Sequence, residues 1–194
     1  MFEFEMPGTI DDLKEMEYEL CEYLGFGDIT EKTYREWQQH YGVSAETELD
    51  AEHELAMEST YGQTMITEFP EMTSPFWNMS RNGDGTSRKI DVILGGMETI
   101  GSAERSTDVD QMRETFHTIT EGAYSSLLFE LFSKDRVQGE LEEFLQHDFF
   151  PRVGGGIGMT RMIAALDKLK VGSIPTPIDS SMGLIQKGSS MMAL

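Results

Sequence analysis

Three charged side chains flank a pair of glycines in the middle of this chain. Asp91, Glu98 and Arg105 follow one another at intervals of seven residues, and Gly95 and Gly96 fall between the two acids. The apolar run around Asp91 and the two glycines predict a β-hairpin that folds Asp91 back toward Glu98. Two neighbouring carboxylates can share a divalent cation, and a guanidinium can bind a small carboxylate in the same cleft. This chemistry suits a nucleotide-bound metal beside a small carboxylate.

A glycine-rich segment later in the chain supplies a second group of candidates. Residues 154–158 read Gly-Gly-Gly-Ile-Gly, and Arg161 follows them. We predict a strand that passes into a helix at this junction. The glycines would let the backbone lie close beneath a flat adenine, and the helix N-terminus favours negative charge. From the first turn of that helix, Arg161 can reach a phosphate with its planar guanidinium.

Together the two segments resemble a known catalytic core. The pattern Asp-x6-Glu-x2-Gly-x3-Arg, formed by residues 91–105 and followed by the glycine-rich segment with Arg161, is similar to class II aminoacyl-tRNA synthetases of the aspartyl/asparaginyl type. Asparagine synthetase A and its archaeal relatives share that core. The resemblance covers about residues 1–169 and implies an α+β fold with a mainly antiparallel sheet flanked by helices. Motif 1 and most of motif 2 would lie before residue 1, so we expect an N-terminally incomplete core.

The resemblance also implies a role for each candidate residue. Mg²⁺ would be held by Asp91 and Glu98, and the catalytic residues would be Arg105 and Arg161. Arg161 would contact the γ-phosphate, and Arg105 would contact the side chain of aspartate or asparagine. The residues implied to bind ATP are Glu98, Gly156, Gly158 and Arg161. Those implied to bind the amino acid are Arg105, Gly101, Phe76 and Asn78.

Each of these residues also has a purely structural explanation. An arginine next to Glu104 can form a surface ion pair, and Asp91 within an apolar strand can be a structural acid with satisfied hydrogen bonds. Phe76 lies in a segment that can equally be a buried aromatic strand. The occurrence of both motifs in the right order favours the site interpretation.

Three functions fit these features. In the first, the protein activates aspartate or asparagine as an aminoacyl-adenylate with ATP and Mg²⁺ and transfers it to tRNA. In the second, the acceptor is ammonia, as in the asparagine synthetase A-like relatives. In the third, the chain is a non-catalytic module, because the arginine of motif 2 is missing. The net charge of −20 repels nucleic acid and favours ammonia over tRNA.

Length and composition limit the organisation of the chain. A length of 194 residues with 39% hydrophobic content supports one globular domain. We predict a partial catalytic domain over residues 1–171 and a flexible tail over residues 172–194. The single cysteine, Cys21, and the lack of an apolar span or secretory leader predict a cytoplasmic protein without membrane contact. We also expect a homodimer or pairing with a missing N-terminal segment.

Hydrophobic periodicity predicts the elements that must position the site. Residues 1–6 alternate apolar and acidic and predict a half-buried strand, and residues 64–70 predict a second one. Helices are predicted over residues 10–24, 30–41, 44–60, 107–117, 123–132 and 137–147, and after residue 158. We interpret the acidic side chains of the 44–60 helix as a solvated face rather than a metal site; they include Glu52, Glu54 and Glu58.

Overall fold

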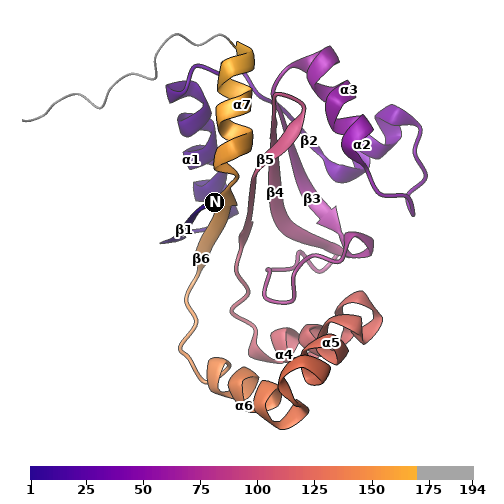
Figure 1. The fold of residues 1–194 in the computed structure, drawn as a ribbon, viewed down its shortest axis with the longest axis vertical. Coiled ribbons are helices and arrows are strands. Elements are labelled where there is room, and N and C mark those ends of the chain that lie inside the picture. Colours follow the sequence, from indigo (N-terminus) through magenta and orange to yellow (C-terminus); the bar gives the residue numbers. More distant parts are fainter. Residues whose placement is uncertain (170–194) are drawn as a thin grey trace, which may run out of the picture.

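A six-stranded sheet organises the part of the chain that the computed structural model describes, residues 1–169 (Figure 1). The strand order is β1-β6-β5-β4-β3-β2, and within the sheet the β2–β3 pair is parallel and the other pairs are antiparallel. The predicted α+β fold with a mainly antiparallel sheet is therefore confirmed. The strands are β1 Phe2–Pro7, β2 Thr30–Thr33, β3 Thr64–Pro70, β4 Thr86–Leu94, β5 Met97–Glu104 and β6 Arg152–Ile157.

The helices cover the two faces of the sheet and one of its ends (Figure 1). They are α1 Ile10–Tyr23, α2 Tyr34–Tyr41, α3 Ala51–Tyr61, α4 Val109–Thr118, α5 Ala123–Phe132, α6 Lys134–Phe144 and α7 Met159–Leu169, with short 3₁₀ turns at Glu71–Thr73 and Ile119–Gly122. No helix within residues 1–169 has the length and apolar character needed to cross a membrane.

The hydrophobic core is divided by the sheet. On one face, Leu13 and Cys21 of α1 pack with Val92 of β4, Ile100 of β5 and residues of α7. On the other face, Trp37 of α2 and Met57 of α3 pack with Ile66 of β3. Because successive side chains of a strand point to opposite faces, Asp91 lies on the face of α2 and α3, opposite the face that buries Ile90 and Val92.

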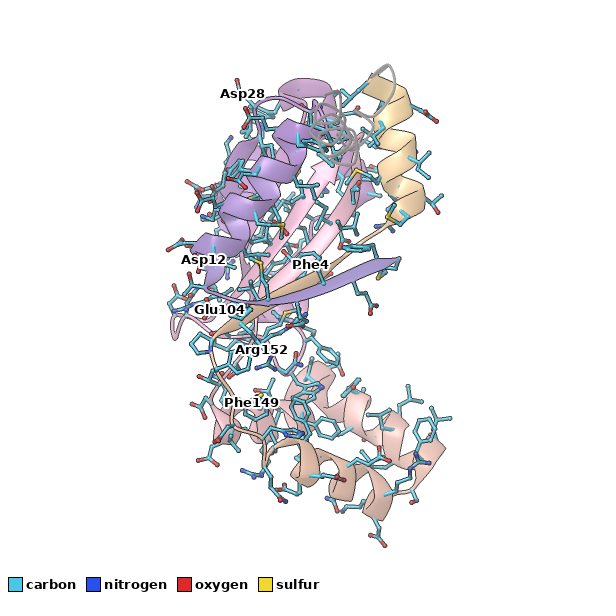
Figure 2. All side chains as sticks on the ribbon, turned by 90° about the vertical axis from the view of Figure 1, so that its left-hand side faces the viewer. Phe4, Asp12, Asp28, Glu104, Phe149 and Arg152 are labelled. Atoms are coloured by element: carbon cyan, nitrogen blue, oxygen red, sulfur yellow. The ribbon has the colours of Figure 1, made fainter. Side chains whose placement is uncertain are left out.

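The helices α4, α5 and α6 form a separate layer below the end of the sheet (Figures 1 and 2). This layer has its own core, in which Met112, Phe116 and Leu141 pack with Trp77 from the segment after β3. Where the chain returns to the sheet, the guanidinium of Arg152 lies over the ring of Phe149, 5.3 Å from its centroid (Figure 2). The layer joins the sheet next to the end of β5 that carries Arg105.

The central hairpin forms as predicted. Gly95 and Gly96 connect β4 to β5 with φ values of +64° and +80°, a region that glycine adopts without steric cost. A register shift between Val92 and Ile93 places Asp91 opposite Gly101 and Ile93 opposite Glu98. The turn and this shift decide which side chains of the two strands lie on the same face.

Several predicted boundaries differ from those in the structure, and the largest differences are the following. Residues 30–33 form strand β2 instead of helix, because their backbone pairs with residues 64–67 of β3, and Thr33 then caps α2 by accepting from the N–H of Glu36 at 3.2 Å. The 44–60 segment becomes helical only at Ala51, after the Asp50 carboxylate caps α3. Helix α6 begins three residues earlier than predicted, at Lys134. The predicted tail, 172–194, lies outside the described residues.

Candidate functional site

The hairpin brings the Asp91 and Glu98 carboxylates together above the backbone of Gly101. A Cβ atom added at Gly101 would lie 2.6 Å from Oε1 of Glu98 and 3.5 Å from Oδ1 of Asp91. Both acids therefore occupy one face of the sheet, as the sequence predicted. Only a residue without a side chain leaves this space open, so Gly101 allows the two carboxylates to approach each other.

Asp91 is a buried acid with one oxygen free to accept a ligand. Its residue surface is 7% exposed, its Oδ2 is paired with the ammonium of Lys89, and its Oδ1 has no hydrogen-bond partner within residues 1–169. Burial raises the pKa of Asp91 to about 6, and the negative charge of Glu98 adds to this effect while Lys89 opposes it. A buried carboxylate oxygen without a partner carries a desolvation cost that a cation can relieve.

Asp91 and Glu98 could supply two of the ligands of a Mg²⁺ ion, with water and substrate phosphates as the others. Among residues 1–169, no three His, Cys, Asp or Glu side chains are arranged to hold a metal ion. Mg²⁺ usually keeps several water ligands and is bound by one or two carboxylates together with substrate phosphates. The donor set of Asp91 and Glu98 suits that mode of binding and does not suit a closed structural metal site.

A third acid, Glu54 of α3, joins this pair. Its Oε2 accepts a hydrogen bond from the backbone N–H of Glu98 at 2.8 Å, and burial raises its pKa. The prediction that Glu54 lies on a solvated helix face was wrong. The missed signal was helical spacing, because Glu54 and Glu58 share a face with Met57, which is fully buried.

Arg161 of α7 contacts Glu98, one of the two carboxylates. Its Nη1 donates to the carbonyl oxygen of Glu98 at 2.5 Å and lies 3.9 Å from Oε2 of the same residue. About half of its side chain, 54%, remains exposed and available to a ligand. A cavity of about 330 Å³ opens here, and its lining includes all four residues that the sequence assigned to ATP: Glu98, Gly156, Gly158 and Arg161.

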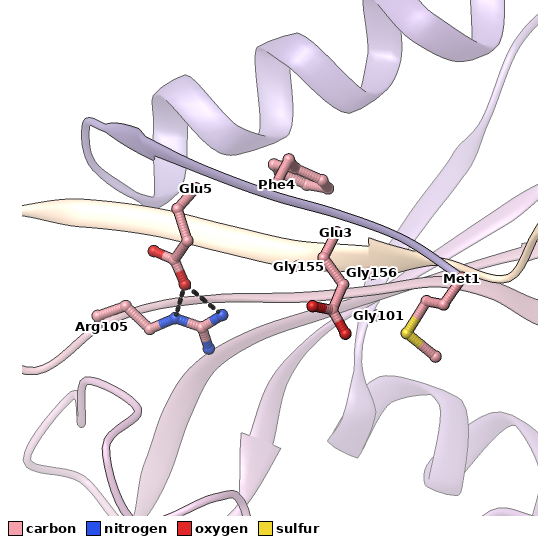
Figure 3. Close-up of a pocket in the computed structure, with 8 residues that line it drawn as sticks. All are labelled: Met1, Glu3, Phe4, Glu5, Gly101, Arg105, Gly155 and Gly156. Atoms are coloured by element: carbon pink, nitrogen blue, oxygen red, sulfur yellow. Dashed lines mark hydrogen bonds and ion pairs between the residues drawn. The ribbon is translucent and has the colours of Figure 1, made fainter.

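Arg105 lies in a neighbouring cavity of about 480 Å³, where Glu5 of β1 holds it (Figure 3). Its Nε and Nη2 atoms both lie 2.8 Å from Oε1 of Glu5. The structural alternative of an ion pair is thus observed at Arg105, with Glu5 as the partner, while the neighbouring Glu104 accepts from Arg88 at 2.6 Å. Glu5 occupies the position that a ligand carboxylate would take on Arg105.

The cavities of Arg105 and Arg161 adjoin each other. Met1, Gly101 and Gly156 line both of them. Gly156 contributes because β6 lies between β1 and β5, in register with Gly101. A single extended ligand could therefore contact Arg105 at one end and Arg161 at the other, with Gly101 and Glu98 between them.

Phe76 and Asn78 line neither cavity. The ring of Phe76 packs against Trp77 and Tyr124 of the helical layer, with ring centroids 5.8 Å and 5.6 Å away. The backbone oxygen of Asn78 accepts from the N–H of Ser106 at 2.8 Å, and its side-chain Oδ1 is buried without a partner within residues 1–169. Asn78 thus supports the end of β5, and contact of either residue with an amino acid stays a prediction.

Sequence reasoning missed two acids on β1. Glu3 and Glu5 line the Arg105 cavity together (Figure 3), although the sequence identified them only as the polar half of a strand alternation. The alternation of β1 did indicate that both point to the same face. It could not indicate which residues would face them, because Glu5 and Arg105 are separated by 100 positions.

Comparisons with known proteins show the family to which the chain belongs. The family model described as tRNA synthetases class II (D, K and N) matches residues 9–171. The asparagine--tRNA ligase of Rhodopirellula baltica is 26% identical over 159 residues, which are 80% of this chain and 30% of that protein. The recognition of this family from the two sequence motifs is therefore confirmed.

Solved structures share the fold at low sequence identity. An aspartyl tRNA synthetase from Entamoeba histolytica matches with a TM-score of 0.66 and 15% identity, over 85% of this chain and 40% of that one. The asparaginyl-tRNA synthetase from Pyrococcus horikoshii, complexed with asparaginyl-adenylate, matches with a TM-score of 0.65 and 18% identity, over 86% and 44%. The chain thus spans less than half the length of each of these relatives.

Proposed function

Since the chain belongs to the class II tRNA synthetases of the D, K and N family, we propose that it activates asparagine or aspartate with ATP as an aminoacyl-adenylate. One observation carries the proposal. The two adjoining cavities place Arg105, Glu98 and Arg161 along one continuous surface, and the buried carboxylate of Asp91 lies beside Glu98 at Gly101. A structural neighbour was solved with asparaginyl-adenylate bound, a ligand with an amino acid at one end and a nucleotide at the other.

The reaction joins two anions, and the site residues address that problem. The α-carboxylate of the amino acid attacks the α-phosphate of ATP, and pyrophosphate leaves. Arg161 binds the γ-phosphate, while Asp91 and Glu98 would hold Mg²⁺, which neutralises phosphate charge when it is bound. Arg105 fixes the amino-acid side chain. Positioning and charge neutralisation of this kind supply most of the acceleration in phosphoryl-type transfers.

The Arg105–Glu5 pair favours asparagine as the amino acid. Glu5 already neutralises the guanidinium, and Glu3 adds a second negative charge to the same cavity. A neutral side-chain amide can accept from Arg105 and donate to Glu5, whereas the carboxylate of aspartate would be repelled by Glu5 and Glu3. The relative in Rhodopirellula baltica is named for asparagine, which supports the same choice.

Transfer of the adenylate to ammonia is the second candidate. It requires aspartate as the substrate, because the product is then asparagine. The net charge of −20 favours this small acceptor over tRNA, since the surface repels a polyanion. Activation of asparagine but not of aspartate would therefore exclude transfer to ammonia.

The first test measures which amino acid drives exchange of pyrophosphate into ATP. We expect exchange with asparagine in excess of that with aspartate. Arg105→Ala should abolish amino-acid binding, measured by calorimetry, and Arg161→Ala should weaken ATP binding at least tenfold by loss of a charge-assisted contact. The matched control is Arg113→Ala, because Arg113 pairs with Glu142 and Asp110 on the helical layer, away from both cavities.

Two results would count against the proposal. Unchanged amino-acid binding in Arg105→Ala would leave the Arg105 cavity without its assigned ligand. A nucleotide affinity equal to that of the unmodified chain in Arg161→Ala would mean that the glycine-rich segment is only a strand and a turn. Exchange with neither amino acid, combined with intact binding of both ligands, would support the non-catalytic module.

A further inference from the structure

A lysine lies on the carboxylate that the proposed function assigns to the metal. The ammonium of Lys89 is paired with Oδ2 of Asp91, and it lies 3.8 Å from the centroid of the Phe69 ring. Lys89 and Asp91 are alternate residues of β4, so their side chains project from the same face. The lysine therefore has two favourable partners on that face, a carboxylate and an aromatic ring.

The balance of charges around Asp91 makes this lysine unusual. Asp91 and Glu98 face the space above Gly101, Glu54 lies next to Glu98, and the negative charges of Glu98 and Glu54 both raise the pKa of Asp91. Two cations face the same space. Arg161 contacts only Glu98 among these acids, which leaves Lys89 as the counter-ion of Asp91 within the described residues. Removal of Lys89 would leave Asp91 buried with both oxygens open.

The remaining oxygen of Asp91 points to a place for a further cation. Oδ1 is buried and has no partner within residues 1–169, and it faces the Glu98 carboxylate across the Gly101 backbone. A metal bound there would lie close to the Lys89 ammonium on the other oxygen of the same carboxylate. Two positive charges at such a short distance repel strongly where water is excluded.

We propose that Lys89 is an internal cation that competes with the divalent metal for Asp91, and that it leaves the carboxylate when the metal binds while its contact with the face of Phe69 remains. This inference rests on the proposed metal site of Asp91 and Glu98. The Phe69 ring lets the ammonium leave the carboxylate without full rehydration. Displacement of Lys89 reduces the binding free energy of a free metal ion. A metal bound to a nucleotide brings negative charge with it, and this charge offsets the repulsion between the metal and Lys89. Lys89 thus makes the site select the metal–nucleotide complex over the free ion.

The test measures binding of Mn²⁺ alone to the 194-residue chain, from the loss of the paramagnetic resonance signal of free Mn²⁺. Lys89→Met keeps an unbranched apolar side chain on Phe69 and removes the charge. We expect this variant to bind Mn²⁺ about tenfold more tightly than the unmodified chain. Adding Asp91→Asn to that variant should abolish the gain.

Lys168→Met is the matched control. Lys168 also pairs with a carboxylate, that of Glu58, and with the carbonyl oxygen of Gly95. The control removes the same charge from the chain but leaves Asp91 untouched, so its Mn²⁺ affinity should equal that of the unmodified chain. Circular dichroism verifies the fold of every variant. Equal affinities in Lys89→Met and Lys168→Met, or weaker binding in Lys89→Met, would overturn the proposal.

A second measurement follows the lysine itself. Acetylation of lysine amines, mapped by mass spectrometry of peptides, should become faster at Lys89 when Mn²⁺ is added and stay constant at Lys168. A constant rate at Lys89 would contradict the displacement. These experiments use the metal alone, so they separate this inference from the proposed function. If Lys89→Met binds Mn²⁺ more tightly but the chain does not bind ATP, the role of Lys89 holds and the adenylate chemistry is wrong. If the chain forms the adenylate but Lys89→Met and the unmodified chain bind Mn²⁺ equally well, the proposed function holds and the role of Lys89 is wrong.

Discussion

Two buried carboxylates lie on opposite faces of the same sheet and differ in what surrounds them. Glu17 of α1 is fully buried, accepts from Oγ of Ser102 at 2.6 Å, and has no partner for Oε2 within residues 1–169. Asp91 is buried to a similar degree but has Lys89 as a counter-ion and shares its space with Glu98. Ser102 and Gly101 are adjacent on β5, so the two environments are separated by the thickness of one strand.

The difference shows how neighbours decide the charge of a buried acid. Burial raises the pKa of Glu17 to about 8, the negative charge of Asp91 adds to this effect, and the hydrogen bond from Ser102 opposes it, so the group is mainly protonated at neutral pH. Lys89 opposes the same effect at Asp91 and limits its pKa to about 6, so that group is mainly ionised at neutral pH. Glu17 is thus a neutral structural acid, and Asp91 is an anion that can bind a cation.

The largest expected effect is on stability and concerns Glu17. Its pKa in the folded state, about 8, lies above its unfolded value of 4.5, so its contribution to stability is fully present below pH 4.5 and is lost as the pH rises through 8. Glu17→Gln keeps an acceptor for Ser102 without a titratable proton. We expect this variant to be more stable at pH 9 by about 4 kcal/mol, measured by urea unfolding.

Asp91→Asn provides the contrast to that variant. The contribution of Asp91 to the stability of the fold declines as the pH rises from about 3.8 to 6. The substitution also removes the counter-ion of Lys89. These effects oppose each other, so we expect a stability change within about 1 kcal/mol at pH 7, together with loss of Mn²⁺ binding. Equal stability profiles for the two variants would show that the two acids have equivalent environments, and the comparison would fail.

The second largest effect is expected at Gly101. Gly101→Ala places a Cβ 2.6 Å from Oε1 of Glu98, and the end of that flexible side chain must move away from Asp91. We expect the free energy of unfolding to fall by about 1 kcal/mol. We also expect Mn²⁺ affinity to fall severalfold, which is more than the loss of stability by itself would cause. Gly139→Ala in α6 is the matched control, because no atom of residues 1–169 lies within 4 Å of its added Cβ. Unchanged Mn²⁺ binding in Gly101→Ala would mean that the two carboxylates do not act together.

The smallest expected effect is on the choice of amino acid. Glu5→Gln leaves Arg105 without its negative partner and removes a repulsion toward aspartate. We expect the ratio of asparagine to aspartate in pyrophosphate exchange to fall a few-fold, with the fold intact by circular dichroism. Glu31→Gln is the control, since Glu31 pairs with Lys14 outside both cavities. A ratio that does not change would show that the Arg105–Glu5 pair has no part in selection.

Some of the site could be predicted because it lies within one hairpin. Asp91 and Glu98 belong to the consecutive strands β4 and β5, Arg105 directly follows β5, and the turn at Gly95 and Gly96 fixes the pairing of the two strands. Lys89 could have been found in the same way, because it is two residues from Asp91 on one strand and must share its face. These relations depend on short-range geometry, which the order of residues specifies directly.

Other parts of the site depend on contacts between distant segments. Glu54 reaches Glu98 across 44 positions only because α3 packs on the face of the sheet. The extended Thr30–Thr33 segment was mistaken for helix because its pairing partner lies beyond residue 60. Local propensity does not reveal such partners, since the competing conformations differ little in free energy until the sheet forms.

The sequence by itself determined the central hairpin, the glycine-rich strand before α7 and the alternating faces of β1. It did so because turns and strand periodicity depend on neighbouring residues. The tertiary structure alone decided that Glu5 holds Arg105, that Glu54 accepts from the backbone of Glu98, and that Glu17 is buried without a cationic partner within residues 1–169. Ion pairs and burial depend on which surfaces come together when distant elements pack, and this packing sets the charge of each acid.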